Sequence, residues 1–315
     1  MMTNTFFPVL QPDEHVLSMF VRRLHLNACR DIKVEQRVLS GKAESLLVGP
    51  IEHSALLTVL NTIEDPVERE RVLREHTLCG FYSHSLRQKW IRSFLSPIRV
   101  KRNKELFIPH ASKLRSTGSW RWCNECVKQD KEVYGLSYWH VEHQLPTSVT
   151  CSKHVNKELV SQCQSCGFIV RDLRNTPYPE TQCSECECDI IHRNEPISSD
   201  LLWLQEQGLA LHRNCSSLYK SSYSHDMNYE VSLRVSKLIE FKGQELWRVQ
   251  EKLQPIFSEW ANDIGADTLF IDGFSFEDDI AVSLSNTILK NRKVSPLSHL
   301  LWLRFLGAES IRAFQ

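Results

Sequence analysis

The sequence predicts a mainly α-helical protein with small β zinc ribbons at its centre. Three observations support this fold class: apolar residues recur at helical spacing in both end thirds, eight of the 11 cysteines lie between Cys123 and Cys188, and most of these pair at metal-ligand spacing. We expect an N-terminal helical, helix-turn-helix-like domain over residues 1–96, a basic approach and tandem zinc-ribbon region over 97–195, and a C-terminal helical domain over 196–315.

The N-terminal third has the pattern of several short helices with brief connections. Helices are predicted at residues 11–28, 33–39, 54–63, 66–76 and 83–95. The first is amphipathic, with Arg22 and Arg23 on its outer face. Asp65 caps the fourth helix, Glu68 is placed to reach back to that cap, and Gly80 indicates a break. Such a bundle fits a helix-turn-helix and a helical protein-binding cap equally well.

A basic strip leads into the cysteine-rich region, although the whole chain is neutral, with 38 Lys and Arg against 38 Asp and Glu. The charged residues of 84–122 are all basic except Glu105, whereas those of 263–279 are all acidic. A basic strip can follow a phosphate backbone. The candidate nucleic-acid contacts are Arg99, Lys101, Arg102, Lys104, Lys113, Arg115 and Arg121. The alternative is a solvated linker whose aromatic residues Phe107, Trp120 and Trp122 pack beneath the zinc ribbons.

The C-terminal third again follows helical spacing. A capped helix is predicted from Ser199, and further helices at residues 229–241, 245–260, 277–289 and 296–306. The apolar stripe on the helix at 245–260 is typical of a packed core. The basic residues 290–293 join the last two helices, which fit either a second helix-turn-helix facing DNA or a solvated turn; the pattern favours the turn.

Four pairs of metal-type ligands organise the centre of the chain. Two residues separate the members of each pair, a spacing at which a tight turn brings both side chains to one tetrahedral ion. The first predicted site comprises Cys123, Cys126, Cys151 and His154, and the second comprises Cys163, Cys166, Cys183 and Cys186. Cys188 is an alternative to Cys186, while His140 and His143 are expected to be packed, hydrogen-bonded histidines. The sequence therefore predicts two structural Zn²⁺ ions per chain.

The number of ligands argues against an enzyme. A hydrolytic zinc keeps an open position and a carboxylate base, whereas four protein ligands fill each predicted site. Glu125 and Glu142 lie nearby but belong to no His-Glu-x-x-His or deaminase-type motif, and the sequence has no glycine-rich phosphate loop. Cys29, Cys79 and Cys215 stand apart, and we expect them to be buried thiols.

The sequence gives no indication of export or of a membrane span. The N-terminal residues lack the basic region and apolar run of a signal peptide. No apolar run approaches the roughly 20 residues that cross a bilayer. We therefore expect a cytoplasmic protein with reduced cysteines and no membrane partner.

Several motifs follow one another in a specific order: Cys123-x-x-Cys126, Tyr134-Gly135, Tyr138-Trp139-His140, His143-Gln144-Leu145-Pro146 and Cys151-x-x-His154. Upstream lie Pro12-Asp13-Glu14 with Ser18 and Arg22, and Glu75-His76-Thr77-Leu78 through Tyr82. Over at least residues 8–190 this order closely resembles the TniQ/TnsD family of transposition target-selection proteins. The chain departs from the family pattern at Asn124, where proline is common, and at Thr147, where glycine is frequent.

The resemblance implies a non-catalytic adaptor that selects a target site for transposition. Members of the family recruit the AAA+ regulator TnsC to an attachment site on DNA, or to a CRISPR RNA-guided Cascade complex on which they form a head-to-tail homodimer. The short chain favours either the guide-dependent role or a truncated form of a longer protein, and the segment from Glu75 to Tyr82 favours DNA reading, so these possibilities stay open. The alternatives are a free-standing zinc-ribbon or helix-turn-helix DNA-binding transcription regulator and a zinc hydrolase that uses Glu125 or Glu142.

Overall fold

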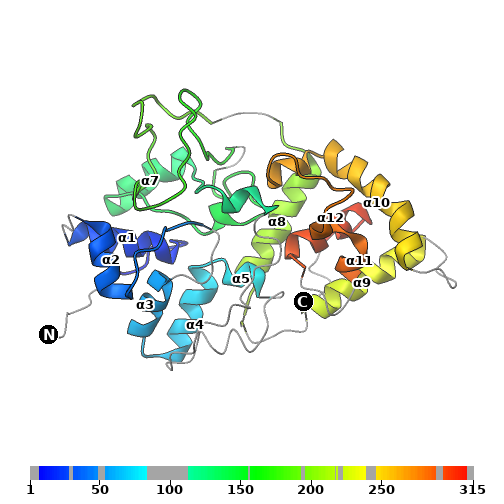
Figure 1. The fold of residues 1–315 in the computed structure, drawn as a ribbon, viewed down its shortest axis with the longest axis horizontal. Coiled ribbons are helices and arrows are strands. Elements are labelled where there is room, and N and C mark those ends of the chain that lie inside the picture. The colour runs from blue at the N-terminus through cyan, green and yellow to red at the C-terminus, as the bar shows by residue number, and fades with distance from the viewer. Residues whose placement is uncertain are drawn as a thin grey trace.

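The computed structural model describes residues 7–27, 31–48, 54–83, 113–154, 157–192, 196–216, 218, 223–238, 246–288 and 294–310. Within these ranges the chain is mainly helical, and its β structure consists of isolated bridges (Figure 1). The mainly helical fold class is confirmed. The helix-turn-helix, the zinc-ribbon layout and the three domain boundaries stay predictions.

The N-terminal part contains the described helices α1 (Val16–Leu26), α2 (Ile32–Ser40), α3 (Ser54–Thr62), α4 (Pro66–Glu75) and α5 (Cys79–Tyr82). Gly41 ends α2 in the left-handed conformation, with φ of 74°, which glycine adopts without a steric penalty. The first helix begins later than its pattern predicts, because Glu14 donates its backbone N–H to the Gln11 carbonyl in a turn (3.0 Å). Arg22 and Arg23 are buried, so their predicted place on the outer face of α1 is wrong.

The sequence predictions for the residues at α4 and α5 are correct in part. Asp65 caps α4 by accepting the Val67 N–H (3.0 Å), as predicted. Glu68 pairs with Arg71 (2.6 Å) instead of reaching back to the cap. Gly80 lies inside α5, where a Cβ atom would stand 2.8 Å from His212 Nδ1. This glycine therefore allows close packing and does not mark a break, while residues 84–95 lie outside the described ranges.

The centre of the chain contains a helix that the pattern of pairs did not predict. Helix α7 (Asn124–Tyr134) begins directly after Cys123 and ends at Gly135, whose φ is 77°. Short 3₁₀ turns lie at Arg115–Thr117 and Glu142–Gln144, and the metal-type loops follow. Trp120, Trp122 and Trp139 are buried, and both Trp120 and Trp122 contact Trp139, with ring centroids 5.6 and 5.7 Å apart. The packed alternative is therefore right for the first two tryptophans, while Phe107 lies outside the described residues.

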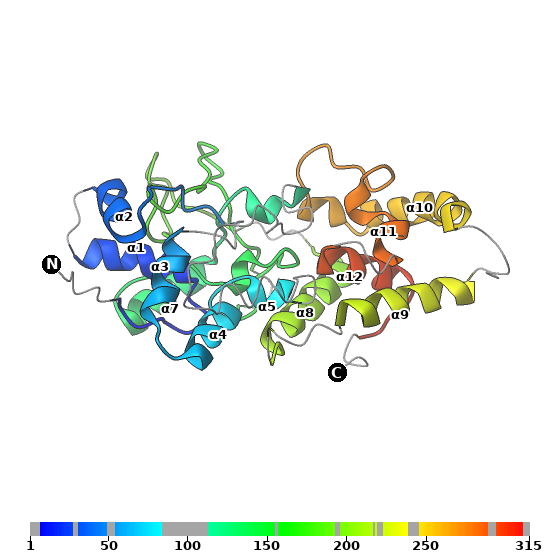
Figure 2. The ribbon, with the colours of Figure 1, turned by 60° about the horizontal axis from the view of Figure 1, so that its bottom comes forward.

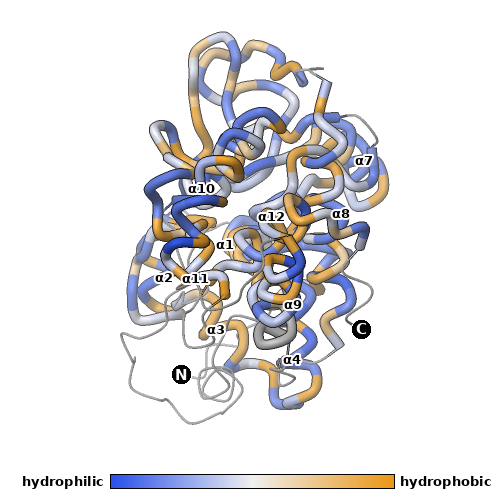
Figure 3. The backbone as a smooth tube through the Cα atoms, turned by 90° about the vertical axis from the view of Figure 1, so that its right-hand side faces the viewer, coloured by the Kyte–Doolittle hydropathy of each residue, from blue (hydrophilic) through white to orange (hydrophobic). Residues whose placement is uncertain are grey.

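The C-terminal part contains, among the described residues, α8 (Ser199–Arg213), α9 (Tyr223–Leu238), α10 (Leu246–Asp263), α11 (Leu284–Ile288) and α12 (Pro296–Phe305). Two 3₁₀ turns, η4 (Ala266–Leu269) and η5 (Ile280–Val282), precede α11. The single helix predicted at 277–289 is wrong because Ser283 is extended and separates η5 from α11. Helix α12 lies among the surrounding helices (Figure 3). Trp302 of α12 stacks on Phe257 of α10, with ring centroids 4.0 Å apart. The basic residues 290–293 lie outside the described ranges.

Helix α8 joins the two helical ends of the molecule. It packs against α4 and α5 on one side and against α12 on the other, and it lies between the two groups of helices in both ribbon views (Figure 1, Figure 2). None of the helices in the described ranges combines the length and apolar composition that a membrane span requires.

Candidate metal centres

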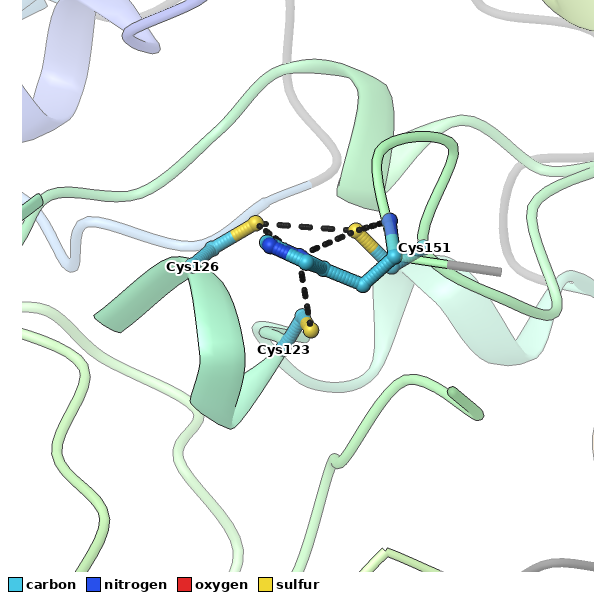
Figure 4. A group of neighbouring side chains, drawn as sticks. Cys123, Cys126 and Cys151 are labelled. Atoms are coloured by element: carbon cyan, nitrogen blue, oxygen red, sulfur yellow. Dashed lines mark hydrogen bonds between the residues drawn. The ribbon is translucent and has the colours of Figure 1, made fainter. Parts of the chain in front are cut away.

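The first predicted ligand set comes together at the start of α7. Cys123 is the residue before the helix, Cys126 lies in its first turn, and Cys151 and His154 approach from the loop that follows residue 150. The three cysteines lie close together, and the sulfurs of Cys126 and Cys151 face each other (Figure 4). All four ligand atoms lie within 4.8 Å of one another. We call Cys123, Cys126, Cys151 and His154 the first centre.

The distances within the first centre fit a tetrahedral ion. His154 Nδ1 lies 3.6, 3.4 and 3.5 Å from the sulfurs of Cys123, Cys126 and Cys151, and the sulfurs of Cys126 and Cys151 are 3.5 Å apart. Zinc–sulfur and zinc–nitrogen bonds of about 2.3 and 2.0 Å give tetrahedral edges of roughly 3.5–3.8 Å. The four side chains are therefore close enough together to hold one zinc ion.

The second predicted set forms the second centre, which comprises Cys163, Cys166, Cys183 and Cys186. Cys163 and Cys186 have their sulfurs 3.7 Å apart, and Cys166 and Cys183 have theirs 3.6 Å apart. These lengths also match the edges of a tetrahedral sulfur site.

The two loops of the second centre repeat one geometry. Gly167 and Glu187, each directly after the second cysteine of its pair, have positive φ angles of 76° and 59°. Each donates its backbone N–H to the backbone carbonyl of the first cysteine of its pair (2.9 Å in both). Cys188 accepts the Cys183 N–H with its carbonyl and has an exposed side chain, while Cys186 contributes to the group of four.

His140 does not belong to the first centre, because two carboxylates hold its ring. Nδ1 lies 3.2 Å from Asp13 Oδ2 and Nε2 lies 2.9 Å from Asp130 Oδ2. Burial opposes the charged ring, but the two carboxylates outweigh it and raise the pKa of His140 to about 9. The imidazolium therefore ties the start of the chain to α7.

His143 lies beside the first centre and outside its four ligands. Its Nε2 is 3.8 Å from Cys126 Sγ, and burial lowers the pKa of its ring, which favours the neutral form. A ring N–H directed at a ligand sulfur is a common support for a thiolate bound to zinc. Sequence reasoning placed both histidines outside the ligand set, and the geometry agrees.

The N-terminal opening packs directly onto this region. Buried Glu14 binds the guanidinium of Arg22 through both oxygens (3.1 and 2.7 Å). The Tyr138 hydroxyl donates to the Pro12 carbonyl (3.0 Å), and Ser18 Oγ accepts a hydrogen bond from the backbone N–H of Trp139 (3.1 Å). The His76 ring at the end of α4 contacts the Glu14 carbonyl (2.8 Å). The motif residues of three separate stretches thus form one buried framework.

Helix α8 docks on the other side of the first centre through residues that the sequence did not indicate. Arg213 donates two hydrogen bonds to Glu142 (2.5 Å each), and Ser152 from the ligand loop donates to the same carboxylate (2.6 Å). Gln205 Oε1 accepts the N–H groups of residues 149 and 150 (2.8 Å each). Gly208 touches Thr147, leaving no room for a Cβ atom. No local pattern marks these residues, because their partners lie far away in the chain.

The carboxylates considered for catalysis are both engaged. Glu142 is buried and bound by Arg213 and Ser152, and Glu125 pairs with Lys128 (3.1 Å). A general base must reach the proton that it removes with a free oxygen lone pair. This arrangement supports a role for Glu142 in holding α8 against the ligand loop.

The structure describes only part of the predicted nucleic-acid strip. Arg99, Lys101, Arg102 and Lys104 lie outside the described residues. Arg121 donates to the carbonyls of Ser148 (2.5 Å) and Leu145 (2.7 Å), and burial lowers its pKa to about 10. Lys113 and Arg115 pair with carboxylates of residues 263–279. The assignment of the strip to nucleic acid stays a prediction.

Comparison with known families gives one match. Residues 5–156 match the model of the TniQ family. This range runs from the N-terminal opening through the complete first centre and stops before the second. No curated protein matches the chain.

Proposed function

The chain belongs to the TniQ family, and from this premise we propose that it is a non-catalytic selector of transposition target sites. In this role it links a target-recognition platform to the AAA+ regulator TnsC and the transposase. The platform is either a DNA attachment site or a CRISPR guide-RNA Cascade complex, and a homodimer is the expected form on the latter. The observation that carries the proposal is the family match over residues 5–156.

The geometry of the two centres supports an adaptor over an enzyme. Each centre offers four protein ligands, which is the ligand set of a structural zinc ion with no position for substrate. When bound, the zinc ions supply structural stability, because the affinity of such a site contributes directly to folding. The chain's own residues then fix α1, α4 and α8 around the first centre, which leaves the outer surfaces to bind partners.

A reconstituted insertion assay tests this function. With donor DNA, transposase and TnsC present, adding the protein should concentrate insertions at the selected site, as measured by sequencing the junctions. Co-purification with TnsC, with a guide-RNA complex or with DNA alone then identifies the platform. Unchanged site choice with and without the protein would refute the proposal, and binding to its own promoter without an effect on insertion would favour the transcription regulator.

A matched variant separates the adaptor from the zinc hydrolase. Glu125→Gln removes a carboxylate beside the first centre that pairs only with Lys128 among the described residues. An adaptor should keep its site choice in this variant, whereas a hydrolase that uses this carboxylate as its base should lose activity. Loss of targeting in Glu125→Gln with zinc content unchanged would count against the adaptor.

A further inference from the structure

The end of the basic strip is bound to an acidic segment of the same chain. Residues 263–279, here called the acidic segment, contain six acidic and no basic residues. Lys113 Nζ lies 3.1 Å from Asp279 Oδ2, and Arg115 Nη2 donates to Asp272 Oδ1 (2.6 Å). Arg115 Nε also donates to the Phe270 carbonyl (3.0 Å). Two neighbouring cations are therefore bound to carboxylates from more than 150 residues away.

The backbone beneath these ion pairs is fixed independently of them. Leu114 and Phe270 are buried and form a bridge, in which the Ile271 N–H donates to the Lys113 carbonyl (3.0 Å). The Arg115–Asp272 pair is open to solvent, since the side chain of Arg115 is 50% exposed and that of Asp272 is 97% exposed. In the Lys113–Asp279 pair the lysine is 42% exposed and the aspartate 14%. An exposed pair such as Arg115–Asp272 contributes little to the stability of the fold. A competing anion can therefore replace the carboxylates without unfolding the contact.

A polar cleft continues from this contact toward the second centre. It has a volume of about 320 Å³. Its lining includes Arg115 and Arg171, the carboxylates of Glu158 and Asp272, the neutral donors Ser119 and Gln162, and several apolar side chains. Arg171 is exposed and makes no ion pair with any described residue. Arginine, lysine, serine and glutamine side chains are the usual donors to phosphate oxygens in nucleic-acid complexes. The cleft thus adds a third cation and two neutral donors to Lys113 and Arg115.

We propose that Lys113, Arg115 and Arg171 form a binding face for a nucleic-acid backbone, and that Asp272 and Asp279 occupy two of its cations until phosphates displace them. The carboxylates mark positions where an anion already sits. The acidic segment thereby lowers the affinity of the face for free DNA. DNA that a partner holds beside the face can still displace the carboxylates. The inference rests on the proposed function for its partner, and its test measures DNA binding without any transposition component.

Binding of a fluorescein-labelled DNA duplex of mixed sequence, followed by fluorescence anisotropy over a range of salt concentrations, tests the face. Arg171→Ala should weaken binding and reduce the slope of log K against log salt by about one, as loss of one phosphate contact requires. Lys237→Ala, an exposed cation on α9, serves as the control and should change neither. Equal binding by Arg171→Ala and the wild type would overturn the proposal.

The displacement step is tested with two double variants of equal charge. Asp272→Asn with Asp279→Asn should tighten binding by roughly two- to tenfold, because two carboxylates no longer compete with phosphate for Lys113 and Arg115. Asp263→Asn with Asp267→Asn changes the net charge equally but removes no described ion pair, and should tighten binding less.

Three results would overturn the inference: equal effects of both double variants, absence of DNA binding in every variant, or equally tight binding of poly-glutamate, which would indicate an acidic protein as partner. Failure of the insertion assay with these binding results intact would refute the proposed function alone.

Discussion

Replacing Gly208 by alanine should disrupt the packing of α8 against the first centre. A Cβ atom at this position would stand 1.9 Å from Thr147 Oγ1, 2.8 Å from Thr147 Cβ and 2.9 Å from Thr147 Cγ2. Rotation of the threonine side chain moves Oγ1 and Cγ2 but leaves its Cβ in place. Because Thr147 is fully buried, the backbone of α8 or of the loop before Cys151 must shift.

Two opposing effects determine the size of the change. Alanine is favoured over glycine inside a helix by about 1 kcal/mol. Overpacking a buried contact typically costs about 1–3 kcal/mol, and a contact with three atoms closer than 3.0 Å belongs at the upper end of that range. The free energy of unfolding should therefore fall by about 2 kcal/mol. The loss should be accompanied by greater hydrogen exchange in α8, since the helix no longer seats on the loop.

Urea unfolding of the zinc-loaded protein, followed by tryptophan fluorescence, measures this change. Gly118→Ala is the matched control, because Gly118 has a negative φ of −86° and the added Cβ atom would lie no closer than 3.4 Å to its nearest neighbour, the Arg115 carbonyl oxygen. This control should stay within about 0.5 kcal/mol of the wild type. Combining Gly208→Ala with Thr147→Gly removes all three close atoms, so the double variant should lose less stability than the two single changes added together. Wild-type stability of Gly208→Ala, or additivity in the double variant, would refute the packing argument.

Three further predictions concern the metal centres and the buried charges. Elemental analysis should find two zinc ions per chain. Cys163→Ser should lose one ion and Cys188→Ser none, because Cys163 belongs to the second centre and the exposed Cys188 does not. Fewer than two ions in the wild type would contradict the assignment. Glu142→Gln should lower the free energy of unfolding by about 1–3 kcal/mol in urea titrations, because it weakens a buried charge-assisted contact to α8, whereas Glu125→Gln should leave it unchanged; equal effects would refute this role. The free energy of unfolding of the wild type should exceed that of His140→Gln by the largest amount below about pH 6.5, and this difference should disappear as the pH rises through about 9. The reason is that the two carboxylates stabilise the protonated ring, which raises the pKa of His140. A difference that does not change with pH would contradict this.

The ligand sets were predictable because their signal is local. Two residues between paired ligands fix the turn, and the cap at Asp65 and the left-handed Gly41 likewise depend on a few neighbouring residues. Helix α7 was missed because Cys123 precedes it and Cys126 lies in its first turn, and the spacing of this pair also fits a tight turn without a helix. Gly135, which ends α7, was the signal that could have revealed it.

Contacts between distant segments could not be predicted from one sequence. The pattern placed Arg22 on the outer face of α1, but its guanidinium binds the buried Glu14 carboxylate and the Val9 carbonyl (2.6 Å). Asp13 meets His140 across 127 residues, and Glu142 meets Arg213 across 71. Periodicity records which face of an element is apolar and says nothing about which charged partner that face will meet.

The departures from the family pattern have structural reasons at both positions. Asn124 is the first residue of α7, the position where proline is most readily accepted in a helix. Here the backbone N–H of Asn124 donates to His192 Nε2 (3.2 Å), a hydrogen bond that proline cannot make because it has no backbone N–H. Helix α7 therefore gains a contact with the segment after the second centre. Thr147 stands where family members often have glycine, and Gly208 on α8 supplies the missing space.

The residues that identify the family therefore face inward. Asp13, Glu14, His76 and His140 are held by one another or by buried neighbours, and together they fix α1 and α4 against the first centre. Such residues determine the relative positions of the helices and are not available to bind a partner. On the proposed function, recognition of DNA, a guide-RNA complex or TnsC would then depend on exposed residues, which can differ between members that share the framework. For this chain, variants of exposed cations such as Arg171 should alter partner binding, whereas variants of the inward motif residues should alter stability first.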